Sequence, residues 1–215
     1  MKRYQLILLG QMKFSVRGQN LKTLVGIDFP DGITDFDCSH NQLTNLQGCP
    51  NSATKLYCSN NLLTSLYGCS NSVTQLLCFN NSLTSLQGCP NSVTELDCFD
   101  NSLTSLHGCS NSVTSLECGG NQLTSLRDCP QSVTGLDCNP NPLREEYKNK
   151  TLEQIHQMNK IKAYKRGIKQ LNRLLATIKI QKNWKRYWYD KVDKQGINRF
   201  CKYALQCDIN NGLVK

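Results

Sequence analysis

A repeat of 20 residues runs from residue 33 to residue 143 without a slip in register. Each of its six rows carries cysteine at one position, asparagine three residues later and leucine two residues after that, as at Cys98, Asn101 and Leu103. A fixed period near 20 residues is the signature of a solenoid, in which every repeat stacks on the next. The chain is therefore expected to form an elongated array of similar turns.

The residues within each row predict its local structure. Leu76 and Cys78 alternate with Leu77 and Phe79, and such alternation sends one side chain inward and the next outward, so each row supplies a short strand. Stacked strands would form one parallel sheet with rungs about 4.8 Å apart. The nine residues between consensus segments are too few for an α-helix of useful length. We therefore predict a mainly β solenoid with an irregular convex side.

A seventh, degenerate row opens the array, since terminal repeats of a solenoid are expected to be atypical. It matches the later rows only if two residues are inserted in the bend from Asp28 to Gly32. Its matching positions are Phe14, Val16, Gln19, Leu21, Leu24 and Ile27. The predicted solenoid spans residues 1–143 with about seven repeats.

Each row contains the pattern L-x-x-L-x-L-x-x-N-x-L, as at Val73, Leu76, Cys78, Asn81 and Leu83. This pattern resembles the leucine-rich-repeat family, and the 20-residue length resembles its shortest class, which is found in bacterial effectors. The Asn-Gln-Leu-Thr-Ser-Leu and Gly-Cys-Pro phrases resemble repeat proteins encoded by giant viruses of amoebae. The resemblance covers residues 11 to 143 and implies that the asparagine column points inward and bonds the backbone of the turn and of the neighbouring rung.

Eleven of the 13 cysteines occupy two repeat columns, which could hold disulfides, metal ligands or buried thiols. In the first row the same columns hold Val16 and Ile27, which can neither ligate a metal nor form a cross-link. The positions therefore favour a small hydrophobic side chain, which free cysteine supplies. We predict buried thiols, no metal and no cofactor, and a reducing compartment. The remaining Cys201 and Cys207 are interpreted as helix packing residues.

The C-terminal segment, residues 144–215, differs in charge from the repeats. It holds 18 Lys or Arg and 6 Asp or Glu, a balance of +12, which leaves 7 against 10, or −3, for residues 1–143. Thr151 and Gln154 form a capping-box pattern that predicts the start of a helix. Apolar residues then recur at spacings of three and four, at Leu152, Ile155, Met158, Ile161, Tyr164, Ile168, Leu171, Leu175 and Ile178. We predict a basic helical cap over the last rung, with a kink or break at Gly167.

The outward strand positions vary between rows and suggest a binding surface on the concave face. Four of them, Tyr57, Leu77, Phe79 and Phe99, should form an exposed apolar cluster. Acidic positions flank this cluster, at Asp35, Asp37, Glu95, Asp97, Glu117 and Asp137. Apolar patches with polar rims mark contact sites. Cover by the C-terminal segment, or neutral drift on a tolerant sheet, would explain the same residues.

The basic segment suggests other functions. Lysine and arginine beside tryptophan could bind phosphates and stack on bases, at Lys179, Lys182, Trp184, Lys185, Arg186 and Trp188. The start of a calmodulin-binding IQ motif is matched by Ile180, Gln181 and Lys185, but Arg186 and Asp190 depart from that motif. Attachment to an anionic membrane surface is a further possibility.

No catalytic constellation is visible in the sequence. His40, His107 and His156 lie in different settings, and no phosphate-binding loop, metal spacing or carboxylate pair appears. We therefore predict a non-enzymatic protein-interaction module, a monomer that binds a protein partner through its concave face. The alternatives are a nucleic-acid-associated protein and a self-associating structural protein. No apolar stretch reaches the roughly 18 residues of a membrane span, so the chain is expected to be intracellular and cytoplasmic, in the host cytoplasm if it is viral.

Overall fold

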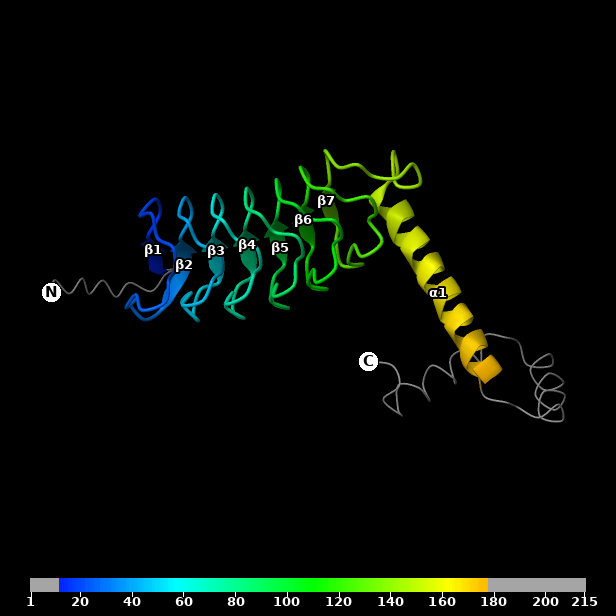
Figure 1. Ribbon diagram of the computed structural model, residues 1–215, viewed down its shortest axis with the longest axis horizontal. Helices are drawn as coiled ribbons and strands as arrows, with labels where there is room; N and C mark the ends of the chain where they lie inside the picture. The colour runs from blue at the N-terminus through cyan, green and yellow to red at the C-terminus, as the bar shows by residue number, and fades with distance from the viewer. Residues whose placement is uncertain (1–11, 178–215) are drawn as a thin grey trace. The chain divides into compact units, whose positions relative to one another are not determined.

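A computed structural model of the chain describes the backbone of residues 12–177 and the side chains of residues 12–173. Seven short parallel strands in these residues stack in chain order as the rungs of one sheet (Figure 1). The elements are β1 (Met12–Ser15), β2 (Ile33–Asp37), β3 (Lys55–Tyr57), β4 (Gln75–Leu77), β5 (Glu95–Asp97), β6 (Ser115–Glu117), β7 (Gly135–Asp137) and α1 (Leu152–Thr177). Only turns and bends connect the strands. The predicted β solenoid with an irregular convex side and a C-terminal helix is therefore confirmed.

The core consists of the inward columns of the repeat. Leu56, Leu76 and Leu116 lie at the centres of their strands and are fully buried, and the cysteine two residues after each of them is buried as well. Further leucines from the turns, such as Leu83 and Leu86, close each layer of the core. Because every row contributes the same shapes at the same depth, one 20-residue pattern fills the interior.

The asparagine column joins each rung to the one before it. Asn61 accepts the backbone N–H of Leu43 at 2.9 Å through Oδ1, and its Nδ2 donates to the carbonyl oxygens of Cys38 and Cys58 at 3.1 Å each. Buried backbone groups that the turn leaves without partners are thereby satisfied. The same bonds recur at Asn41, Asn81, Asn101, Asn121 and Asn141. This is the arrangement that the resemblance to leucine-rich-repeat proteins implies.

The eleven repeat cysteines are free thiols; seven of them are buried, as predicted, and the other four are half-buried. The Cys58 thiol donates to the Leu77 carbonyl oxygen of the next rung at 3.4 Å. Burial raises the pKa of Cys49 to about 11 and that of Cys109 to about 12, so these thiols are neutral at physiological pH. They therefore act as small core residues. Cys201 and Cys207 lie outside the described residues.

The two-residue insertion of the first row packs an aromatic side chain against the core. Phe29 packs edge-to-face against Phe14, with ring centroids 5.8 Å apart, and against Phe36, at 5.0 Å. Such pairs add about 0.5–1.5 kcal/mol to the free energy of burial. The insertion thus joins the first two rungs through apolar contacts.

The residue three positions after the end of strands β2 to β5 adopts a left-handed backbone conformation. His40, Asn60, Asn80 and Asp100 have φ between +53° and +55°. Asn and Asp tolerate this region better than other residues with a β-carbon, which explains the residue types at this column. A second turn needs Gly68, whose φ is +86° and whose β-carbon would overlap the backbone of Gln47.

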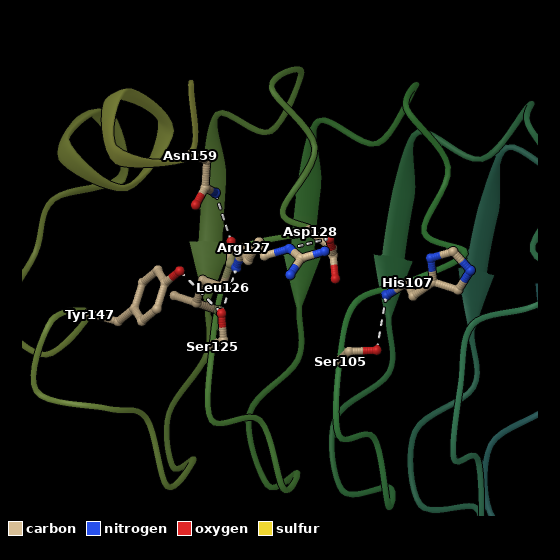
Figure 2. A network of polar contacts seen from close by, with 8 residues as sticks. All are labelled: Ser105, His107, Ser125, Leu126, Arg127, Asp128, Tyr147 and Asn159. Atoms are coloured by element: carbon tan, nitrogen blue, oxygen red, sulfur yellow. Dashed lines mark hydrogen bonds and ion pairs between the residues drawn. The ribbon is translucent and has the colours of Figure 1, made fainter. Parts of the chain in front are cut away.

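The last rung is closed by residues that follow the repeats. Tyr147 and Ile155 are buried against the core, and the Ser125 hydroxyl donates to the Tyr147 hydroxyl oxygen at 3.1 Å. Asn159, from the second turn of α1, donates its amide to the Leu126 carbonyl oxygen at 2.8 Å (Figure 2). A covered end keeps the core of the last repeat away from water. The first residues after the repeats therefore contact the last rung.

Helix α1 begins as the capping box predicts. The Thr151 hydroxyl accepts the Gln154 N–H at 3.2 Å, and the Gln154 side chain accepts the Thr151 N–H at 3.1 Å. The helix continues through Gly167 without the predicted break, because a single glycine costs only about 1 kcal/mol within a helix. Two residues of the predicted apolar face, Ile161 and Tyr164, are exposed.

The chain divides into two compact units within this helix, between Lys160 and Ile161. The helical residue Ile161 and those after it therefore belong to a unit separate from the solenoid. Across residues 12–177, no helix combines the length and the apolar character that crossing a membrane requires.

Candidate partner-binding surface

The outward side of the sheet is called here the strand face, and it consists of three columns of side chains. The parallel register places equivalent residues of neighbouring strands directly beside each other, as with Lys55, Gln75 and Glu95. The first column contains Lys13, Asp35, Lys55, Gln75, Glu95, Ser115 and Gly135. The second contains Ser15, Asp37, Tyr57, Leu77, Asp97, Glu117 and Asp137. The third contains Arg17, Ser39, Ser59, Phe79, Phe99, Gly119 and Asn139.

The four apolar residues of the strand face differ in exposure. Tyr57 and Leu77 are register partners on β3 and β4, and both are half-buried, as is Phe79. Phe99 is 42% exposed and is the only one of the four that is largely open to solvent. The predicted apolar cluster therefore lies at the middle of the array, with Phe99 as its most accessible member.

Phe99 lies against the backbone of the following rung. An added β-carbon at Gly119 would stand 3.1 Å from Phe99 Cδ2, and one at Gly120 would stand 3.4 Å from its Cζ. The absence of side chains at these two glycines leaves room for the ring. One side of the ring is supported by the sheet, and the rest is open to solvent.

The acidic residues of the second column have a structural role that the sequence analysis missed. Asp37, Asp97 and Asp137 each accept, through Oδ1, the backbone N–H of the residue two positions later, at 2.9 to 3.0 Å. Ser15 makes the equivalent bond with the N–H of Arg17 at 3.3 Å. A short side chain that accepts a backbone N–H at this position competes with the hydrogen bonds of the sheet and so ends the strand. A structural requirement therefore accounts for part of the acidic character of the face.

Asp35 is buried, with 5% of its side chain exposed, although strand alternation alone predicts an exposed position. Its register partners are Lys13 on β1 and Lys55 on β3. Asp35 Oδ2 lies 3.6 Å from the Lys13 amino group, and within the described residues Oδ1 has no hydrogen-bond partner. Asp35 is therefore less accessible to a partner than the sequence suggested.

Charge is distributed unevenly along the strand face. The positions of β1 to β3 combine Lys13, Arg17 and Lys55 with Asp35 and Asp37. The nine positions of β5 to β7 hold four carboxylates and no lysine or arginine. The acidic residues are Glu95, Asp97, Glu117 and Asp137. One half of the face is thus mixed in charge and the other half is acidic, and Leu77 and Phe79 lie in the row between them.

Burial raises the pKa of the Asp97 carboxyl, although its hydrogen bond from the Phe99 N–H lowers it in part. The folded chain therefore binds this proton more tightly than the unfolded chain does. Once the pH rises above the ordinary pKa of an aspartate, ionisation of Asp97 lowers the free energy of unfolding. We expect Asp97→Asn, whose amide oxygen can still accept the Phe99 N–H, to raise the free energy of unfolding at pH 7 by less than about 1 kcal/mol, since nearby water screens this half-buried group.

Urea unfolding of both proteins at pH 7 and at pH 3.5 tests this expectation. The advantage of Asp97→Asn should shrink at the lower pH, where the carboxyl of the original protein becomes protonated. An equal difference at both pH values would contradict it.

The structure brings together one cysteine and one histidine that lie far apart in the sequence. His156 Nε2 lies 3.9 Å from the sulfur of Cys129. Burial raises the pKa of Cys129 to about 12, so the nucleophilic thiolate is not populated at neutral pH. His40 occupies a turn, and the His107 backbone N–H donates to Ser105 Oγ at 3.4 Å (Figure 2). Among the described residues, no group of three His, Cys, Asp or Glu could hold a metal ion.

The residues of the nucleic-acid alternative, Lys179, Lys182, Trp184, Lys185, Arg186 and Trp188, lie outside the described residues. The same is true of the IQ-like segment. Both alternatives therefore stay predictions from the sequence.

No protein-family model matches the chain, and no curated protein matches it. Among solved structures, the chain is similar to YopM from Yersinia enterocolitica WA-314, with 29% sequence identity and a TM-score of 0.49. The likeness covers 54% of this chain and 26% of the YopM chain, so this chain spans a minor part of that structure. The resemblance to repeat proteins of giant viruses stays an interpretation of the sequence. The functional argument therefore depends on the strand face itself.

Proposed function

We propose that this protein is a non-enzymatic interaction module that binds a protein partner through its strand face. The observation that carries the proposal is the apolar cluster of Tyr57, Leu77, Phe79 and Phe99 at the middle of that face. The inward columns repeat with little change, whereas the outward columns vary along the array. A regular scaffold with a variable surface is suited to recognition.

The energetics of known protein interfaces support the assignment of the strand face as a binding surface. Aromatic residues near the centre of an interface contribute most of the binding energy, and polar residues at the edges exclude water. Phe99 is 42% exposed in this chain, so a partner can still remove much of its surface from water. The three half-buried members are held by the sheet, which lowers the entropy lost when a partner binds.

Replacement of Phe79 and Phe99 by serine tests the proposal. We expect the double variant to lose at least about tenfold in affinity for the partner, because two aromatic contacts are removed. Affinity capture from a cell lysate identifies the partner, and isothermal titration with the purified partner then measures the loss.

A matched control removes apolar surface elsewhere on the solenoid. Leu62 and Tyr67 are 53% and 63% exposed and do not belong to the three columns of the strand face. Leu62→Ser with Tyr67→Ser should leave the affinity unchanged. Equal affinity of the Phe79 and Phe99 variant and the original chain would refute the proposal, provided that circular dichroism shows both to be folded.

The free thiols also favour a reducing cellular compartment for the proposed interaction. Eleven unpaired cysteines in one array are best maintained where glutathione and thioredoxin keep thiols reduced. The proposed interaction therefore takes place in a reducing, intracellular compartment.

A further inference from the structure

The C-terminal half of the strand face has a charge of one sign. We call the acidic half the nine outward positions of β5, β6 and β7, which contain Glu95, Asp97, Glu117 and Asp137 and no lysine or arginine. Phe99 adjoins these carboxylates, and of the apolar cluster it is the member most open to solvent. An aromatic ring among carboxylates is a suitable contact for a cation that has a hydrocarbon stem.

A glycine that the fold does not require lies within the acidic half. Gly135 is on β7, its φ is not positive, and an added β-carbon would meet only Ser115 Oγ at 3.7 Å, an ordinary contact. The equivalent positions on β3 and β4 carry Lys55 and Gln75, so the sheet accepts long side chains there. Glycine inside a strand weakens it and often marks a place where another backbone approaches closely.

Gly119 differs from Gly135 because the fold does require it. An added β-carbon at Gly119 would overlap the Asn139 carbonyl oxygen of the next rung. The Phe99 ring lies beside Gly119, so Gly135, next to Ser115, is the position at which the floor of the acidic half lacks a side chain. A polypeptide segment could therefore approach the sheet more closely here than at β3 or β4.

We propose that the partner presents a lysine- or arginine-rich segment, which lies across β5 to β7 on the acidic half. The inference rests on the proposed function and specifies the chemistry of the partner. Its cationic groups meet Glu95, Asp97, Glu117 and Asp137, and one of its hydrocarbon stems covers Phe99. Complementary charge favours this pairing and speeds association. A nucleic acid does not fit this surface, because its phosphates would face four carboxylates.

Selection of phage-displayed random peptides on the full chain tests the proposal without a choice of ligand. We expect the selected peptides to contain an excess of lysine and arginine. Fluorescence anisotropy then measures their affinity for the full chain and its variants. The affinity should fall at least about tenfold when salt rises from about 50 to about 300 mM, since exposed charges are screened. It should fall by a similar factor in the double variant Glu117→Gln with Asp137→Asn.

Gly135→Gln tests the close approach of the segment. Glutamine occupies the equivalent position on β4, so this variant should fold normally while its side chain obstructs the floor. We expect affinity for the selected peptides to fall about fivefold or more, whereas Lys55→Gln, at the same column of β3, should leave it unchanged. Unaltered affinity in Gly135→Gln would overturn the proposed approach across β7.

The other outcomes separate this inference from the proposed function. Neutral or acidic peptides that lose affinity with Phe79→Ser and Phe99→Ser would overturn the basic partner and leave the strand-face function standing. Peptides whose affinity is unchanged by every strand-face substitution would overturn both the basic partner and the strand-face function. If the affinity of basic peptides rises about tenfold when Lys179, Lys182, Lys185 and Arg186 are changed to glutamine, the chain's own basic segment occupies the face, and a separate partner is refuted.

Discussion

Asn101→Ala is expected to lower the free energy of unfolding by about 3–5 kcal/mol, among the largest effects of any single substitution in this chain. Its Oδ1 accepts the Leu83 N–H at 2.9 Å, and its Nδ2 donates to the carbonyl oxygens of Cys78 and Cys98 at 3.1 and 3.2 Å. Alanine would leave all three backbone groups buried without these partners, and each such group costs about 1–3 kcal/mol. Urea unfolding followed by circular dichroism measures the change.

A second asparagine provides the control for this prediction. Asn111 occupies an exposed turn position ten residues later. Asn111→Ala should change the free energy of unfolding by less than about 0.5 kcal/mol, as is usual for surface substitutions. If the two alanine variants were equally stable, the asparagine column would not be what joins neighbouring rungs.

The effect of Asn101→Ala should also extend beyond one rung. Its bonds connect the row of Leu83 with its own row, which contains Cys98, and the stability of a solenoid depends on interfaces between neighbouring repeats. We therefore expect hydrogen exchange to become faster on both sides of the substitution.

Phe36→Ala is expected to destabilise the chain by about 3–5 kcal/mol, the range typical of buried aromatic residues. Phe36 is fully buried on β2 and packs edge-to-face on Phe29. Its removal would leave a cavity at the first rungs, where Phe14 and Phe29 would lose their support. Thermal and urea unfolding measure the loss.

Phe99→Ala is the matched control, because it removes the same side chain from a position that is 42% exposed. We expect it to lower the free energy of unfolding by less than about 1 kcal/mol. A loss as large as that of Phe36→Ala would show that Phe99 serves the core and would weaken its assignment to a binding surface. The comparison therefore tests fold and function at once.

The candidate site could be predicted in part. Strand alternation placed Tyr57, Leu77 and Phe99 on the outward side, since every second residue of a strand points to the same face. It could not predict how far each is covered, because exposure depends on side chains of neighbouring rungs. Asp35 shows the difference, for it is outward by alternation yet is buried, with Lys13 and Lys55 as its register partners.

The sequence by itself determined the architecture of this protein. Its 20-residue period specified the stack of rungs, the inward leucine and cysteine columns, and the strand positions, and the resemblance to leucine-rich-repeat proteins implied the inward asparagine column. The Thr151 and Gln154 pair specified the start of the helix. These features are local or periodic, so they can be read one row at a time.

Only the tertiary structure decided which distant residues meet. It placed His156 beside Cys129, Asn159 on the Leu126 carbonyl and the Phe99 ring beside Gly119. It also showed that the fold requires a glycine at position 119 but not at Gly135. The physical reason is that packing between rungs depends on contacts between residues 20 or more positions apart. A repeat pattern specifies the register of these contacts, but it does not specify how far each side chain is buried by its neighbours.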